Sequence, residues 1–296
     1  MKTNKINLAS RYFLTALVAA GTLLTACDKD KVPAPGPDSG TLRVKAGIVD
    51  YAGAESDAGG DSEIRSMQAC VFDGGRLTHV YDNLAVLPGG FYEISLDSRK
   101  GNLYMVANAD GLLDLDELQL QGTSEEDWLR TTISSAEGSP VHFLSGSVAL
   151  DGSGSTVPLK LKRGVARFDL KVRTAGVAEI NSVSLKNVAG SAYLFPVDGK
   201  YSPEGAPLTE LKAEFDSPLT ADTSGVLHVH EQPAGTVAVS VDAVIDGKPV
   251  VLEKELSEPV ERNTVYTLTV RKDEIDVSLE VSLEDWQQGG DTELTP

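Results

Sequence analysis

The residue pattern that decides the fold is clearest in Leu159-Lys160-Leu161-Lys162-Arg163-Gly164-Val165-Ala166-Arg167-Phe168-Asp169-Leu170-Lys171-Val172. Leu159 and Leu161 alternate with lysines, and apolar residues from Ala166 to Val172 alternate on the opposite parity. Apolar residues at every second position predict β-strands with one buried face. The parity changes at Arg163-Gly164, where we expect a β-bulge to restore the register.

The same alternation recurs along most of the chain. Residues 237–245 alternate and end in Asp246-Gly247, a pair typical of hairpin turns. The cleanest alternation places Val277, Leu279, Val281 and Leu283 on one face and Ser278, Glu280, Ser282 and Glu284 on the other. Further strands are predicted at Thr41–Tyr51, Ile64–Phe72, Tyr92–Leu96, Leu103–Asn108, Val141–Leu150 and Tyr266–Val270.

Two short segments favour helices instead of strands. Ser124-Glu125-Glu126-Asp127 resembles a capping box, in which a hydroxyl and a carboxylate satisfy the free N–H groups at a helix start. We therefore expect a short helix over 124–135 and a second over 112–120. The chain is predicted to be all-β with one or two short helices.

The length of the chain and a glycine- and serine-rich segment near its middle predict two domains. Residues 41–296 suffice for two domains of ordinary size. The stretch Gly152-Ser153-Gly154-Ser155 indicates a flexible break between two sets of strands. We place one β-sandwich domain at 41–155 and another at 156–296.

The first 26 residues have the pattern of an export signal. Lys2, Lys5 and Arg11 precede an apolar run from Tyr12 to Ala26, and no acidic residue occurs before position 28. The run is shorter than the roughly 20 apolar residues that a membrane-spanning helix needs. The sequence therefore predicts a secretory signal and not a permanent span.

The signal ends in a motif that resembles a lipobox. Leu24, Thr25 and Ala26 precede Cys27, whose thiol would carry the lipid after cleavage. The alternative is a plain signal peptide with a chance cysteine. Residues 27–40 are polar and hold three prolines, so they are predicted to form a flexible tether. The folded part would then lie outside the cytoplasm.

Charge and cysteine content exclude several functional classes. The full chain has a net charge of −18, which is unsuited to nucleic acid and disfavours docking on anionic lipid. Cys70 is the one cysteine besides Cys27, so no internal disulfide is expected. Because Cys70 falls in a predicted strand, we interpret it as a small buried residue and not as a nucleophile.

Candidates for catalysis or metal binding are weak. His228 and His230 share a strand face and could chelate zinc, but two ligands without a third are more typical of an ordinary strand. Asp110, Asp114, Asp116 and Glu117 lack the spacing of a calcium-binding loop and favour a solvated helix face. No nucleophile elbow or nucleotide-binding glycine motif occurs. The sequence predicts no cofactor, no metal and no enzyme activity.

Four segments together resemble the FimA-type fimbrillins, the subunits of type V pili in some Gram-negative anaerobes. The segments, in chain order, are Glu63–Gly75 (EIRSMQACVFDGG), Leu103–Gly111 (LYMVANADG), Leu159–Arg167 (LKLKRGVAR) and Glu261–Val270 (ERNTVYTLTV). Their order behind a lipoprotein signal carries the resemblance, which covers nearly all of residues 41–286.

The resemblance implies two tandem transthyretin-like β-sandwich domains and a mode of assembly. A lipid-anchored precursor at the outer membrane would lose its first strand to an arginine-specific protease. The emptied groove would accept a strand from another pilus subunit, its expected partner. The product would be a cell-surface fimbrium that supports adhesion to host or bacterial surfaces.

By position, the resemblance also assigns roles to particular residues. The displaced strand is Thr41 to Tyr51, and the candidate cutting positions are Arg65 and Arg43. The donor region is carried by Val277, Leu279, Val281, Leu283 and Trp286.

Because of two departures from the family pattern, more than one role in a pilus is considered for this chain. Residues 44–64 contain no arginine, so a cut after Arg65 would clip the start of the predicted strand 64–72. Only ten residues follow Trp286, which is short for an extending donor. A tip, accessory or anchor subunit is therefore considered beside a stalk subunit.

Two further interpretations stay open at this point. A monomeric surface lipoprotein that binds a glycan or host protein would need an exposed aromatic patch, for which Tyr193, Phe195 and Tyr201 are the clustered candidates. A hydrolase would need a deep pocket with paired carboxylates.

Overall fold

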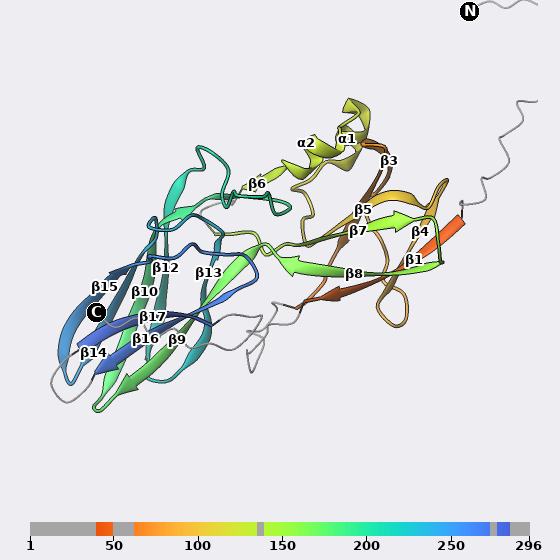
Figure 1. The fold of residues 1–296 in the computed structure, drawn as a ribbon. Coiled ribbons are helices and arrows are strands. Elements are labelled where there is room, and N and C mark those ends of the chain that lie inside the picture. The colour runs from red at the N-terminus through yellow and green to blue at the C-terminus, as the bar shows by residue number, and fades with distance from the viewer. Residues whose placement is uncertain (1–39, 50–61, 135–138, 273–276, 285–296) are drawn as a thin grey trace, which may run out of the picture. The chain divides into compact units, whose positions relative to one another are not determined.

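The chain folds into β-sheets with two short helices, as the alternation predicts. The computed structural model describes residues 40–49, 62–134, 139–272 and 277–284 (Figure 1). Among these residues, neither helix has the length and apolar character needed to cross a membrane. The Cys27 lipid site, its lipobox and the tether lie outside the described residues.

The first part of the chain forms a seven-stranded sheet. Its strands are β1 (Gly40–Ile48), β2 (Met67–Asp73), β3 (Arg76–Tyr81), β4 (Phe91–Leu96), β5 (Lys100–Ala107), β7 (Leu144–Asp151) and β8 (Thr156–Arg163). They are ordered β3-β2-β5-β7-β8-β1-β4, and only the β1–β8 pair is parallel. A parallel pair needs a long crossover between its strands, and here β2 to β7 supply it.

The second part forms two four-stranded sheets. One has the order β12 (Leu208–Leu219), β10 (Ala178–Ala189), β14 (Ala238–Ile245) and β15 (Lys248–Glu255). The other has the order β13 (Thr223–His230), β9 (Val165–Thr174), β16 (Val265–Lys272) and β17 (Val277–Glu284). A short pair joins β6 (Thr132–Ser134) to β11 (Ser191–Tyr193).

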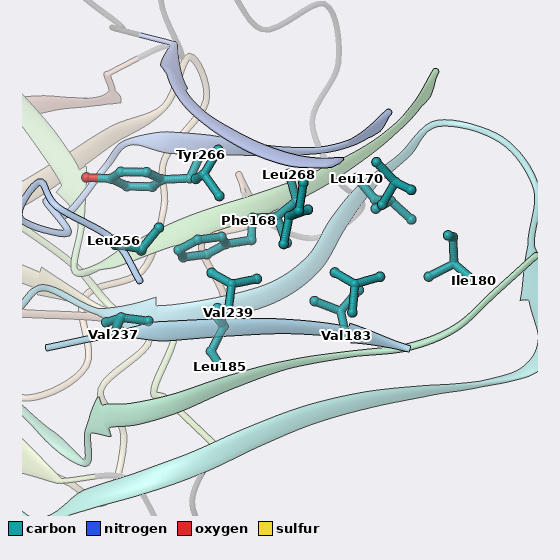
Figure 2. Packing of buried hydrophobic residues seen from close by; sticks show 14 of the residues in the cluster. Phe168, Leu170, Ile180, Val183, Leu185, Val237, Val239, Leu256, Tyr266 and Leu268 are labelled. Carbon is teal, nitrogen blue, oxygen red and sulfur yellow. The ribbon is translucent and has the colours of Figure 1, made fainter. Parts of the chain in front are cut away.

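The two four-stranded sheets share one hydrophobic core, which makes this part a β-sandwich. Figure 2 shows side chains of β9 and β16 facing side chains of β10 and β14. The rings of Phe168 and Tyr266 stack with centroids 5.1 Å apart. Ala166, Phe168 and Leu170 of β9 therefore do what their period predicts, because each buries its side chain between the two sheets.

Besides the sandwich core and a core within the first part, a third buried cluster joins strands of both parts through aromatic rings. Trp128 lies 6.3 Å from Phe72 and 5.6 Å from Phe195, measured between ring centroids. Phe195 and Tyr193 are buried, and Tyr201 is half-buried. The exposed aromatic patch that a glycan-binding surface would need is therefore not formed by these three residues.

Helix α2 (Glu125–Leu129) begins where Ser124 predicts but ends early, and the helix expected over 112–120 begins later, at Leu115. In α2 the Ser124 hydroxyl accepts a hydrogen bond from the Asp127 N–H. In α1 (Leu115–Gln121) Asp114 plays the same role for Glu117. The expected helix over 124–135 is wrong in length, because the chain leaves it after Leu129 and enters β6, where Ile133 is buried.

Sheet membership changes at Gly164. β8 pairs with β7 and β1, whereas β9 begins at Val165 and pairs with β13 and β16. The expected β-bulge is therefore wrong, since the parity changes where the chain passes from one sheet to another. Because β8 belongs to the first sheet, we propose that the division between the two parts lies at Gly164 and not after Ser155.

The crossing at Gly164 has no room for a side chain, and this yields a first prediction. A Cβ at Gly164 would lie 2.0 Å from the Phe143 ring, so Gly164→Ala should lower the free energy of unfolding by about 1–3 kcal/mol. Gly47→Ala is the matched control, because a Cβ there meets nothing within 4 Å. Urea unfolding measures both, and equal stabilities would contradict the packing described.

Candidate functional site

The first strand lies inside its sheet and not at an edge. β1 pairs antiparallel with β4 on one side and parallel with β8 on the other. Leu42 lies opposite Ile94, and Ile48 lies opposite Leu161. Removal of β1 would therefore leave two rows of backbone N–H and C=O groups without partners, which is costly in a sheet interior.

The two faces of β1 differ as its sequence predicts. Leu42 and Val44 are fully buried in the core of the first part, and Ala46 and Ile48 pack against that core. On the other face, the Arg43 guanidinium lies 4.6 Å from the centroid of the Phe91 ring. β1 thus fills an apolar groove with every second side chain.

Arg43 is a poor position for proteolysis in this fold. It lies within β1, between Glu93 of β4 and Thr156 of β8, and its N–H donates to the Ser155 carbonyl at 2.9 Å. Proteases need a segment that can leave its neighbours, and this one is paired on both sides.

Arg65 lies in a different setting, and the expected strand start is wrong. β2 begins at Met67 and not at Ile64, so the exposed Arg65 precedes the strand. The physical reason is Asn108, whose side chain takes the place of a neighbouring strand. Its amide donates to the Glu63 carbonyl at 2.8 Å, and its Oδ1 accepts from the Arg65 N–H at 2.8 Å.

The position of Arg65 resolves one departure from the family pattern, namely a cut that would clip the start of the second strand. A cut between Arg65 and Ser66 would leave β2 whole, since the strand starts one residue further on. Asn108 has a φ of 59°, a left-handed conformation that asparagine adopts more readily than most residues. That conformation allows its own N–H to bond the Ser66 carbonyl at 3.3 Å.

One buried arginine holds the chain on both sides of residues 50–61. Arg163, which is 4% exposed, donates through Nη1 to the Val49 carbonyl at 3.1 Å. Its Nη2 donates to the Ser62 hydroxyl at 2.8 Å. Nη1 also lies 3.3 Å from Oδ1 of Asn263 in the second part.

No pattern in the sequence assigns a role to the side chains of Arg163, Asn108 or Asn263. Asn263, like Asn108, has a positive φ, and its N–H donates to the Val165 carbonyl at 2.8 Å. The available signals were an arginine at the sheet crossing and asparagines at strand ends. Their partners are far away in sequence, so spacing alone did not reveal the contacts.

The candidate donor region forms an edge strand in this structure. β17 pairs antiparallel with β16, and Leu279 and Val281 are buried in the core of the sandwich. These two residues confirm the predicted alternation. The side chains of Val277 and Leu283, and all of Trp286, lie outside the described residues.

The weak metal and nucleophile candidates gain no support. His230 is fully buried with Nδ1 3.2 Å from the Ala189 carbonyl, and burial lowers its pKa to about 4. The His228 ring contacts that of His142. In the described part of the chain, no group of three histidine, cysteine or acidic residues is placed to hold a metal. Burial raises the pKa of the Cys70 thiol to about 12, so it is not a nucleophile at neutral pH.

The acidic cluster borders a hollow of about 440 Å³ at the start of α1. The hollow is lined by Asp110, Asp114 and Asp116 of that cluster and by Asp82, all of which are exposed, as is Glu117. Asp114 caps α1, and Asp82 accepts a hydrogen bond from Gln68. A glycosidase needs one carboxyl group held in a desolvated site, which these solvated groups do not provide.

Comparison with solved structures identifies the fold. The chain is similar to a fimbrial assembly protein from Parabacteroides distasonis ATCC 8503, with a TM-score of 0.58 and 14% identity over 87% of this chain and 99% of that chain. It is also similar to the tip fimbrial protein Mfa3 from Porphyromonas gingivalis with C-terminal truncation, with a TM-score of 0.56 and 13% identity over 83% and 99%.

A fimbrilin (FimA) from Porphyromonas gingivalis W83 matches with a TM-score of 0.50 and 13% identity over 82% of this chain and 95% of that chain. No family model matches the sequence, and no curated protein matches it. At these identities the likeness concerns the fold, and at that level the resemblance to fimbrillins is confirmed.

The hydrogen bonds of Asn108 yield a second prediction. Asn108→Gly keeps the left-handed backbone but loses two side-chain hydrogen bonds of about 1 kcal/mol each. An arginine-specific protease should then cut after Arg65 about 10- to 30-fold faster, because cleavage follows the population of the open segment.

The control for this prediction is Asn187→Gly. Asn187 has a φ of 61° and an exposed side chain, and it belongs to β10 in the second part. N-terminal sequencing of a digestion time course measures the rate at each position. Equal rates at Arg65 in the two variants would contradict the account of Asn108.

Proposed function

We propose that this chain is a structural subunit of a cell-surface pilus. It is exported as a precursor with lipid on Cys27, loses β1 by proteolysis and receives a strand from another subunit. The observation that carries the proposal is a buried strand at the start of the chain, paired on both sides and followed by an exposed arginine. The shared fold with fimbrial proteins supports the same function.

The energetics of β1 favour exchange over an empty groove. Removal of β1 exposes an apolar channel and two strand edges, and each Å² of exposed apolar area costs about 25 cal/mol. A replacing strand restores both the burial and the backbone hydrogen bonds. Subunits joined in this way would be held strongly without a covalent bond, and the precursor would stay monomeric while its own strand fills the groove.

Arg65 is the cutting position that we favour. A cut there releases β1 with residues up to 65 and leaves the first residue of β2 in place. The ordinary stalk role therefore stands beside a tip, accessory or anchor role for this chain. β17 is the strand that we propose as the donor, because an edge strand leaves its sheet by breaking one row of hydrogen bonds.

We expect adhesion and not catalysis to be the activity of the assembled fimbrium. The four aspartates at the α1 hollow are solvated, and burial holds the one internal thiol in its protonated form. The buried ring of Phe195 disfavours the alternative of a monomeric glycan binder that uses an aromatic patch.

Arg65→Gln tests the proposed cut. The wild-type precursor, treated with an arginine-specific protease, should lose its N-terminal fragment and then form oligomers over time. Arg65→Gln should stay monomeric under the same treatment. Arg130→Gln, which removes an exposed arginine at the end of α2, should behave as the wild type. Size-exclusion chromatography with mass detection distinguishes these results, and oligomers of the Arg65→Gln protein would contradict the proposal.

Cys27→Ala tests the proposed anchor. In a detergent phase-separation assay on bacterial cells, the wild-type precursor should enter the detergent phase and carry the extra mass of its lipid. The variant lacks the thiol that forms the thioether and should remain in the aqueous phase. Detergent partitioning of the variant equal to that of the wild type would show that Cys27 is not the lipid site.

A further inference from the structure

The groove that β1 occupies ends at a buried cation. Because β1 and β8 run parallel, the last residues of β1 lie beside the last residue of β8, Arg163. Val49 follows β1 directly, and its carbonyl accepts from the Arg163 guanidinium. The Ser62 hydroxyl accepts from the other terminal nitrogen of the same group.

Removal of β1 takes both of these acceptors away. A cut after Arg65 releases everything before Ser66, so Val49 and Ser62 leave together. The Asn263 side chain still faces the guanidinium, which is 4% exposed while β1 is in place and loses two of its acceptors when β1 leaves. The emptied groove therefore favours an incoming strand that brings an acceptor to Arg163.

Hydrolysis replaces one positive charge near this point with another, because the Arg65 guanidinium leaves with the fragment. The reaction consumes one water, leaves a carboxylate on the departing Arg65 and creates an α-ammonium group on Ser66, with a pKa of roughly 8. Arg65 and Arg163 line the same cavity of about 20 Å³, so the new ammonium forms one residue from it. An acceptor with negative charge then fits better than a neutral carbonyl.

We propose that Arg163 is a specificity-determining residue of the emptied groove and binds a carboxylate on the incoming strand. The inference rests on the proposed strand exchange and adds the chemistry by which the groove selects its strand. The matching strand has four apolar residues in alternation, followed by an acidic residue at the level of Arg163.

The chain itself contains a segment of this form. The apolar positions of β1 are Leu42, Val44, Ala46 and Ile48, and those of the C-terminal segment are Val277, Leu279, Val281 and Leu283. Ile48 lies opposite Leu161 in the parallel register. In the same register, a residue two positions after the one opposite Leu161 would lie opposite Arg163. When Leu283 takes the place of Ile48, the residue at that level is Asp285.

A peptide competition tests the inference on the full-length protein. The precursor is cut with an arginine-specific protease in the presence of two peptides, Val277–Trp286 (VSLEVSLEDW) and the same peptide with Asp285→Asn, one of them isotopically labelled. Native mass spectrometry measures which peptide replaces the released fragment. We expect a preference of roughly ten- to a hundredfold for the aspartate peptide, as hydrogen bonds between charged groups give.

Substitutions in β8 test whether Arg163 causes this preference. Arg163→Gln should abolish the preference, and Lys162→Gln should keep it, because Lys162 loses the same charge one residue away on the exposed face. If Arg163→Gln fails to fold, the competition on the wild-type protein still tests the inference, because it compares the two peptides directly. Equal binding of the two peptides would overturn the role of Arg163 and leave strand exchange intact. If no peptide enters the groove, the proposed exchange and this inference are both wrong.

Discussion

The structure depends on the pairing of β1 with two strands that come much later in the chain. β4 and β8 each present a row of backbone groups to β1, and the buried Leu42 and Val44 fix which face of the strand points inward. A slip of one residue would turn the charged face of Arg43 and Lys45 into the core, so the register is strongly determined. A strand at the start of the chain thus completes a sheet that the rest of the first part builds.

Arg163 and Asn263 couple this strand to the second part. The Arg163 guanidinium touches the end of β1 and the Asn263 side chain, and the Asn263 N–H bonds the first residue of β9. A second buried arginine, Arg262, pairs with Glu231 and donates to the Tyr193 carbonyl at 2.8 Å. Arg163 loses two of its acceptors when β1 leaves, so the loss of β1 also changes the contacts at the sheet crossing.

Local patterns in the sequence predicted many of the strands, because a strand that buries one face shows a period of two, but β3, β10 and β12 were not predicted. Ser124 marked the start of α2 through its capping chemistry, whereas the capping role of Asp114 in α1 was not predicted. The predictions that were wrong concern features that depend on contacts between residues far apart in the sequence. The pairing of β8 with β1 and β7 shows that β8 belongs to the first sheet, and the Asn108 side chain explains why β2 begins at Met67. Arg65 was chosen by position, but its exposed setting before the strand required the structure.

The central claim is that β1 is removed and replaced. The most direct measurement is the N-terminal sequence and intact mass of the protein taken from the surface of its native host. The account predicts a chain that begins at Ser66 and carries no lipid. A chain that begins at an acylated Cys27 and retains β1 in the assembled fimbrium would contradict it.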